Sequence, residues 1–271
     1  MLKKTSTNED TALHEAVRNN HPQVVEILIR EKPEFANMAN AAGESPLYLA
    51  ALLEYKSIAV EILNPSSVAY TGPNGRTALH EAVISKDKVL LLNDGKSAAY
   101  IGDKSGKTPL HIAIFHGKSH LKVAEKIMAG CPDCCDLVDN RGRNVLHFAV
   151  QSKSSEGVKT IIEKPSLANL INQKDKKGNT PVHLLATYGF EEYCLAEHHL
   201  VDKKAINNEN LAALDVVVKT KDESDEPFLG RTKRKLKKVG YKPGRPSIIQ
   251  LAERDDMSRL DNELIIELEK T

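Results

Sequence analysis

Tryptophan is absent from this chain of 271 residues, and aromatic residues make up only 4% of it. Proteins that bind single-stranded nucleic acid stack the bases on aromatic side chains, so this composition argues against that function. An excess of charge of one sign is missing as well, because 38 Lys and Arg residues nearly balance 37 Asp and Glu residues, for a net charge of +1. We therefore expect no nucleic-acid partner and no general attraction to one class of charged ligand.

Long apolar runs are also missing. Nowhere do about eighteen apolar residues follow one another, and the N-terminus lacks the apolar segment of a signal peptide. Four cysteines, three of them at Cys131, Cys134 and Cys135, do not make a disulfide framework in a chain of this length. These absences predict a cytoplasmic protein without a membrane span, and they leave peripheral attachment to the plasma membrane open.

Signatures of catalysis are missing too. The sequence has no glycine-rich phosphate loop, no nucleophile elbow and no zinc-protease motif. Cys131 and Cys134 have the spacing of metal ligands, but a closed zinc site needs four ligands and no second pair follows at a suitable spacing. We expect no enzyme, no cofactor and no metal, and we interpret the cysteines as thiols of a partly buried loop.

The chain does contain one short phrase six times. Its copies are Thr11-Ala12-Leu13-His14, Ser45-Pro46-Leu47-Tyr48, Thr77-Ala78-Leu79-His80, Thr108-Pro109-Leu110-His111, Asn144-Val145-Leu146-His147 and Thr180-Pro181-Val182-His183. A period near 33 residues built on T-P-L-H-x-A is similar to the ankyrin repeat, in which a turn precedes two short antiparallel helices. Such a unit buries its apolar face only by stacking on further copies. The sequence thus predicts an all-α ankyrin-repeat solenoid with β-turn or hairpin fingers.

The turns that open the units set their boundaries. A tetrad that begins with Asn, Asp or Gly and ends in glycine precedes every copy after the first, and Glu9 stands in the glycine position of the first. Asp or Asn can bond the backbone of such a turn, and glycine supplies its positive φ. We expect repeats over residues 1–220, with units starting near 9, 43, 75, 106, 142 and 178. An eroded seventh unit near 210 has Asp215 in the histidine position.

The recurring histidine invites a catalytic interpretation. One residue type at the same position of five repeats is better explained by a structural role, because buried polar groups need hydrogen-bond partners. We predict that each imidazole bonds the preceding Thr hydroxyl and the backbone of a nearby loop. Second helices with apolar residues at helical spacing follow, for example over Val89, Leu91 and Leu92 in the third unit.

Beyond the repeats the composition changes. Residues 221–246 are expected to form a charged, basic linker, and residues 247–271 an amphipathic helix through which the chain could form oligomers. The basic run consists of Arg231, Lys233, Arg234, Lys235, Lys237 and Lys238. Three interpretations stay open for it: a solvated linker, a segment drawn to an anionic membrane surface, and a nuclear-import patch.

Several segments resemble one family. The strings Thr11 to Asn19, Cys131 to Cys135 and Asn144 to Ala149, together with residues 238–252, resemble the plant ankyrin proteins of the accelerated-cell-death type. The resemblance implies multipass membrane proteins that act in plant defence, cell death and stress signalling, with the ankyrin array on the cytosolic side. Their C-terminal membrane domain is named for a Pro-Gly-Gly motif, and the present sequence ends at Thr271 before any such domain.

We therefore expect a non-enzymatic protein–protein interaction module, in plant defence, cell-death or stress signalling at the cytosolic face of a membrane. Its alternatives are a fragment of a multipass channel or transporter-like assembly, and a nuclear regulatory adaptor. The expected partner is an acidic protein segment on the fingertips and the adjoining concave face. The cations predicted to bind it are Lys104, Lys107, Arg141, Arg143, Lys174, Lys176 and Lys177, although such side chains could also simply keep the turns soluble.

Overall fold

The computed structural model describes residues 8–63, 68–86, 97–190, 193–219 and 226–244. The chain divides into two compact units, Met1–Lys176 and Lys177–Thr271. The predicted second helix of the third repeat and the predicted helix over 247–271 lie outside the described residues. Among the described residues, no helix is long and apolar enough to cross a bilayer.

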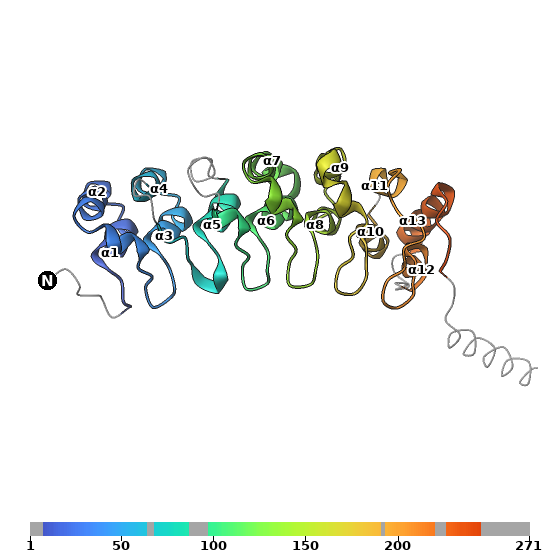
Figure 1. The fold of residues 1–271 in the computed structure, drawn as a ribbon, viewed down its shortest axis with the longest axis horizontal. Coiled ribbons are helices and arrows are strands. Elements are labelled where there is room, and N and C mark those ends of the chain that lie inside the picture. Colours follow the sequence, from blue (N-terminus) through green and yellow to red (C-terminus); the bar gives the residue numbers. More distant parts are fainter. Residues whose placement is uncertain (1–7, 64–67, 87–96, 191–192, 220–225, 245–271) are drawn as a thin grey trace, which may run out of the picture. The chain divides into compact units, whose positions relative to one another are not determined.

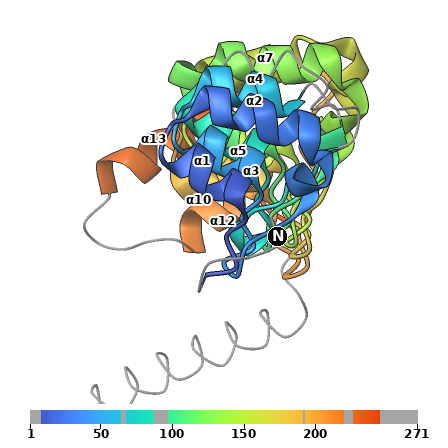
Figure 2. The same ribbon diagram turned by 90° about the vertical axis from the view of Figure 1, so that its left-hand side faces the viewer.

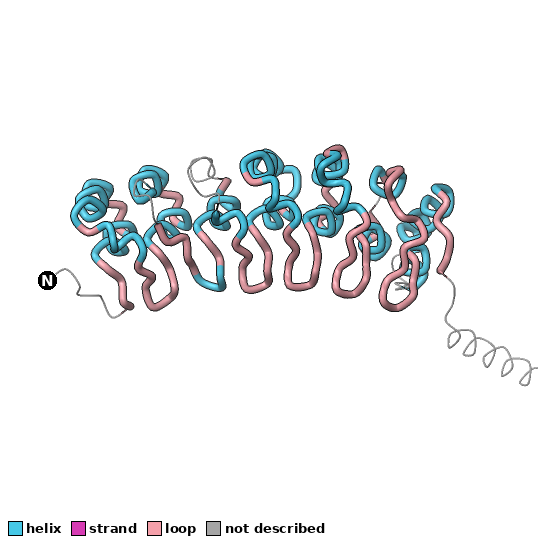
Figure 3. Tube along the Cα trace, viewed as in Figure 1, coloured by secondary structure: helices cyan, strands magenta, loops and turns pink. Residues whose placement is uncertain are grey.

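The first unit is a row of helix pairs joined by loops, which lie side by side (Figures 1 and 3). Its first helices are α1 (Ala12–Arg18), α3 (Pro46–Leu52), α5 (Ala78–Ser85), α6 (Pro109–Phe115) and α8 (Val145–Gln151). Its described second helices are α2 (Pro22–Glu31), α4 (Lys56–Leu63), α7 (Leu121–Gly130) and α9 (Ser155–Ile162). Short 3₁₀ segments are η1 (Pro33–Asn37), η2 (Pro73–Gly75), η3 (Ser97–Tyr100), η4 (Gly117–His120), η5 (Pro132–Asp136) and η6 (Pro165–Ile171).

The helices of this unit form two layers around an aliphatic core. Viewed along the row, α1, α3 and α5 overlie one another, and α2, α4 and α7 make the second layer (Figure 2). Leu13, Leu47, Leu110 and Leu146 from the repeated phrase are fully buried. Burying a leucine stabilises the fold by about 1.5 to 3 kcal/mol, and each of these leucines depends on the neighbouring repeat for its cover.

We call the loops that contain the tetrads fingers. The last residue of each tetrad has a positive φ. Gly106, with φ of 76°, ends the finger tetrad 103–106, and a Cβ there would lie 2.6 Å from the backbone nitrogen of Asn140 in the next finger. Glu9 and Asn210, which replace glycine in the first and seventh repeats, adopt φ of 59° and 58°. Positive φ at this position is therefore kept where another residue replaces glycine.

The second unit contains α10 (Pro181–Tyr188), α11 (Cys194–Glu197), α12 (Ala213–Lys219) and α13 (Glu226–Val239). Asp215 takes over the predicted histidine role, because its Oδ2 accepts a hydrogen bond from the backbone N–H of Ala212 at 2.9 Å. The turn before it is held in the same way as the fingers that begin with Asn40, Asp103 and Asp139, with Asn207 Oδ1 accepting from the N–H groups of Glu209 and Leu211.

The expectation of a linker over 221–246 was wrong for residues 226–239, which form α13. Thr232 and Leu236 of this helix are fully buried, and its contacts lie on α10, α11 and α12. Tyr241 is also buried, and its hydroxyl donates to the carbonyl of Ala196 at 3.1 Å. The basic run therefore belongs to a packed helix, which covers apolar surface on one face and displays its cations on the other.

Candidate protein-binding groove

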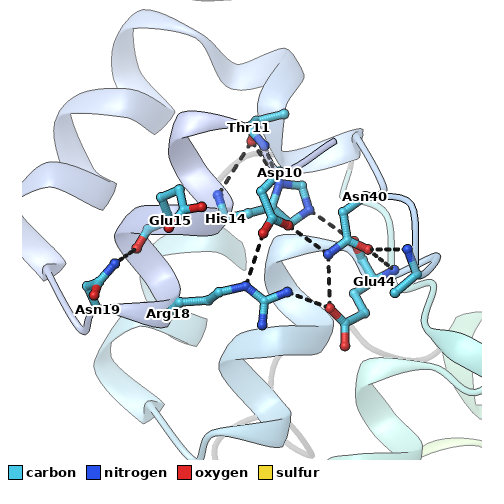
Figure 4. Close-up of polar contacts among 9 residues, drawn as sticks. Asp10, Thr11, His14, Glu15, Arg18, Asn19, Asn40 and Glu44 are labelled. Atoms are coloured by element: carbon cyan, nitrogen blue, oxygen red, sulfur yellow. Dashed lines mark hydrogen bonds and ion pairs between the residues drawn. The ribbon is translucent and has the colours of Figure 1, made fainter. Parts of the chain in front are cut away.

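The repeated histidines connect each helix cap to the following finger. His14 Nδ1 accepts from the backbone N–H of Thr11 at 3.1 Å, so its proton is on Nε2, which donates to the carbonyl of Glu44 at 2.9 Å (Figure 4). His80 and His111 make the same pair of contacts, to the carbonyls of Lys107 and Arg143. The predicted structural role of these side chains is confirmed.

Burial controls the protonation of these imidazoles. It lowers the pKa of His111 to about 4, and it also lowers the pKa values of His14 and His80. The rings are thus neutral near pH 7. Each hydrogen bond from a cap N–H to Nδ1 requires this form, because a protonated ring has no acceptor.

The cysteine cluster has no metal-binding arrangement. Cys131, Cys134 and Cys135 are not joined in disulfides, and all three are buried. In the described part of the chain, no group of three or more His, Cys, Asp or Glu side chains is placed to hold a metal ion. A hydrogen bond to Cys135, together with burial, raises the pKa of Cys134, so this thiol stays protonated.

The predicted fingertip cations differ in their exposure. Lys104, Arg141 and Lys176 are exposed and stand on three successive fingers of the first unit. Adjacent fingers are bonded through their backbones: Asn140 N–H donates to Ser105 O at 2.9 Å, and Lys176 N–H donates to Arg141 O at 2.8 Å. These bonds fix the backbones of the three fingers relative to one another. Lys174 is exposed in the same unit, and the exposed Lys177 begins the second unit.

Arg143 does not belong to this exposed set, and its predicted role as a contact for an acidic partner conflicts with its surroundings. Its side chain is only 9% exposed, and its Nη2 lies 2.7 Å from Oδ2 of Asp139. Its Nη1 donates to Gln151 Oε1 at 2.8 Å, and its guanidinium carbon lies 4.7 Å from the centre of the Phe148 ring. All these contacts fix the base of one finger against α8, so the residue is structural.

A groove of about 240 Å³ lies beside these residues, between α5, α6 and α8. Its apolar lining includes Ile84, Ile112, Phe115 and Phe148. Phe115 is 45% exposed and meets the buried Phe148 edge to face, with ring centres 6.4 Å apart. An exposed aromatic ring supported by a buried one can hold an apolar side chain of a partner.

The polar lining of the groove includes three basic side chains, two of which are paired with carboxylates of the protein. Arg76 and Lys107 line it together with Arg143, against one carboxylate, Asp103. Asp103 Oδ1 accepts hydrogen bonds from the backbone N–H groups of Ser105 and Lys107. Arg76 forms an ion pair with Glu81 at 3.0 Å. Among the ion pairs of the described residues, none involves Lys107 or Lys104. Lys107 lines the groove, and Lys104 lies on the tip of the same finger.

Sequence reasoning identified Lys107 but missed the apolar part of this groove. The available signal was an aromatic residue two positions after the alanine of the repeat, Phe115, next to Phe148 in the following repeat. Two such residues are noticeable in a chain with so few aromatics. Their approach, however, depends on the register between adjacent repeats, which only the structure shows.

The second predicted patch lies on α13. Arg231, Arg234, Lys237 and Lys238 are exposed, and Lys233 and Lys235 are half-buried. Lys235 forms an ion pair with Glu197 at 3.0 Å. Neither lipid binding nor nuclear import is tested by this arrangement, and both stay predictions.

A profile described as ankyrin repeats (3 copies) matches residues 1–71, 55–136 and 88–171. The mouse (Mus musculus) protein rabankyrin-5 is 29% identical over 196 residues, which cover 67% of this chain and 16% of that protein. The Arabidopsis thaliana protein ACCELERATED CELL DEATH 6 is 30% identical over 220 residues, covering 70% of this chain and 32% of that protein. The chain thus spans about a sixth and about a third of these two relatives.

The fold is also similar to a solved structure. The ankyrin repeat domain of Bcl-3 superposes with a TM-score of 0.63 at 22% sequence identity, covering 77% of this chain and 94% of that one. The predicted all-α repeat fold is confirmed, and this fold is typical of non-enzymatic scaffolds that bind other proteins. The histidine caps, the bonded fingers and the profile over residues 1–171 lead to one conclusion: the chain belongs to the ankyrin-repeat family.

Proposed function

We propose that the first unit binds an acidic protein segment that carries an apolar anchor residue. The observation that carries this proposal is the groove, in which the exposed Phe115 ring lies beside Lys107, for which the described residues provide no ion pair. The anchor would pack on Phe115, and flanking carboxylates would face Lys107 and the fingertip cations Lys104 and Arg141. Bonded fingers support this proposal, because a preorganised surface loses little entropy when it binds.

We further propose that this binding serves plant defence, cell-death or stress signalling at the cytosolic face of a membrane. This setting rests on the resemblance to the accelerated-cell-death type of ankyrin protein and on the likeness to the Arabidopsis protein of that name. Proximity labelling in plant cells tests it. We expect labelled neighbours at a membrane, and their loss when Phe115 is replaced.

A library of random displayed peptides tests the groove itself. We expect the selected peptides to combine an aromatic or large aliphatic residue with Asp or Glu, and to bind the Phe115→Ser variant at least about tenfold more weakly. The matched control is Leu52→Ser. Leu52 is the last residue of α3, the position that Phe115 has in α6, and it is 46% exposed outside the groove.

Two results of the peptide selection contradict the proposal. One is a set of peptides without acidic residues. The other is equal loss of binding in the Phe115→Ser and Leu52→Ser variants, which would mean that the groove has no special role. Because both residues are exposed to the same extent, neither change should alter the folding of the unit, and circular dichroism checks this.

A further inference from the structure

A second pocket, of about 400 Å³, lies on α13 within the second unit. It is lined by Tyr193, Arg231, Arg234, Lys235 and Lys238. The four cations occupy positions i, i+3, i+4 and i+7 of the helix, which places them on one face. They extend along about 10 Å of the helix axis. No carboxylate contributes to the lining, so the pocket has a strongly positive character.

The helix that carries these cations is fixed from its other side. Thr232 and Leu236 are fully buried, and Lys203 Nζ donates to the carbonyl of Val239 at 2.9 Å, which satisfies a carbonyl at the end of the helix. Tyr241 folds back beneath it through its bond to Ala196. The basic side chains therefore project from a rigid support, which lowers the entropic cost of binding a ligand compared with a flexible linker.

One lining cation is already positioned by the protein. Lys235 Nζ lies 3.0 Å from Glu197 Oε1 and 5.2 Å from the centre of the Tyr193 ring. Its charge is partly neutralised, so Arg234 and Lys238 carry more of the attraction for an anion. Arginine presents a planar pair of donors that matches two oxygens of one phosphate, and lysine adds a point charge.

We propose that this pocket binds the inositol headgroup of a membrane lipid that carries two or more phosphate groups. A single phosphate could engage only neighbouring cations, whereas four cations spread along about 10 Å of helix suit several phosphates on one ring. The exposed Lys237 and Lys242 lie outside the lining and extend the positive surface, which favours an anionic membrane over a small soluble anion. The proposal is independent of the groove in the first unit.

Vesicle sedimentation with the full chain tests it. We expect binding to phosphatidylcholine vesicles that contain phosphatidylinositol bisphosphate, and much weaker binding when phosphatidylserine supplies the same total charge. The double variant R234Q/K238Q should bind the phosphoinositide vesicles about 30-fold more weakly, since each cation near an anionic surface contributes about fivefold. The control K237Q/K242Q removes the same charge outside the pocket and should lose less than about threefold.

Three results would overturn the proposal: equal losses in the two double variants, equal binding to both kinds of vesicle, or no binding to either. Stronger binding to soluble inositol hexakisphosphate than to phosphoinositide vesicles would reject the membrane as the source of the ligand. Preference for a single-stranded oligonucleotide at the same salt concentration would reject the phosphoinositide class altogether.

A variant that gains affinity separates the pocket from an effect of misfolding. Glu197→Gln removes the ion pair of Lys235 and should tighten binding to phosphoinositide vesicles by about fivefold. Glu209→Gln, which removes an exposed carboxylate from the finger before α12, is the charge-matched control and should change binding by less than about twofold. An equal gain in both variants would mean that net charge, not the pocket, determines the affinity.

Discussion

Replacing Arg143 with alanine is expected to lower the free energy of unfolding by about 3 to 5 kcal/mol, because the change leaves a buried carboxylate without its partner. The side chain of Asp139 is only 1% exposed, and its Oδ2 accepts from both Nε and Nη2 of Arg143. These hydrogen bonds outweigh the opposing effect of burial and lower the pKa of Asp139, so the carboxylate is charged near pH 7. Urea denaturation followed by circular dichroism measures the loss.

The matched control is Arg141→Ala, two residues earlier on the same finger. Arg141 is exposed and forms no ion pair among the described residues, so its replacement should change the free energy of unfolding by less than about 0.5 kcal/mol. The double variant D139N/R143A should be more stable than R143A, because it removes the uncompensated charge. If R143A were as stable as R141A, the pair would not anchor the finger.

The repeat architecture could be predicted from the sequence because each of its determinants is local. A capping Ser, Thr or Asn, a proline in the first turn, a leucine for the core and a histidine three residues after the cap lie within four consecutive residues of one repeat. The structure confirms them, with Pro46, Pro109 and Pro181 each the first residue of a helix. Even the replacements could be placed, since Asp215 occupies the histidine position and holds its cap in the same way.

The candidate site was less predictable because it depends on contacts between repeats. Arg141 and Arg143 flank the same glycine, yet Arg143 is buried against α8 and Arg141 is exposed on the finger. Only the path of the turn decides between them. Likewise, Phe115 gains its role from Phe148, which lies 33 residues away in sequence but in contact with it in space.

The linker prediction was wrong because the periodicity of these residues, and not their charge density, determines their structure. Thr232 and Leu236 are four residues apart, which puts both on one helix face, and the cations at 231, 234, 235 and 238 share another. Pro227 near the start and Gly240 after the end also fit helix boundaries. These signals are present, but the eight Lys and Arg residues between 227 and 246, together with Pro243 and Pro246, suggest a flexible segment.

Acid is expected to destabilise the fold. We expect the free energy of unfolding to be highest above about pH 6.5 and to decrease steadily toward pH 4. The histidines of the caps are neutral in the folded state because burial lowers their pKa values, whereas in the unfolded chain they ionise near pH 6.5. Below that pH the unfolded state binds more protons than the folded state, so stability is lost as the pH falls.

His111 alone accounts for a loss of about 3 kcal/mol, because its pKa is near 6.5 when unfolded and about 4 when folded, and each pH unit between them corresponds to about 1.4 kcal/mol. His14 and His80 add to this loss in the same direction. Asp10 and Asp139, whose pKa values are lowered in the fold, lose their contribution only below about pH 4, so they do not explain the loss above it.

Urea denaturation at a series of pH values between 7.5 and 4.5, a window of about three pH units set by these pKa values, measures the effect. The His111→Gln variant should be less stable than the wild type at pH 7.5, since the cap loses its partner, but its stability should depend less steeply on pH. The exposed His21→Gln variant is the control and should keep the wild-type slope. A flat profile in the wild type would mean that the cap imidazoles take up protons at the same pH in the folded and the unfolded chain. Their two hydrogen bonds oppose this, because a ring that accepts at Nδ1 and donates from Nε2 has no place for a second proton.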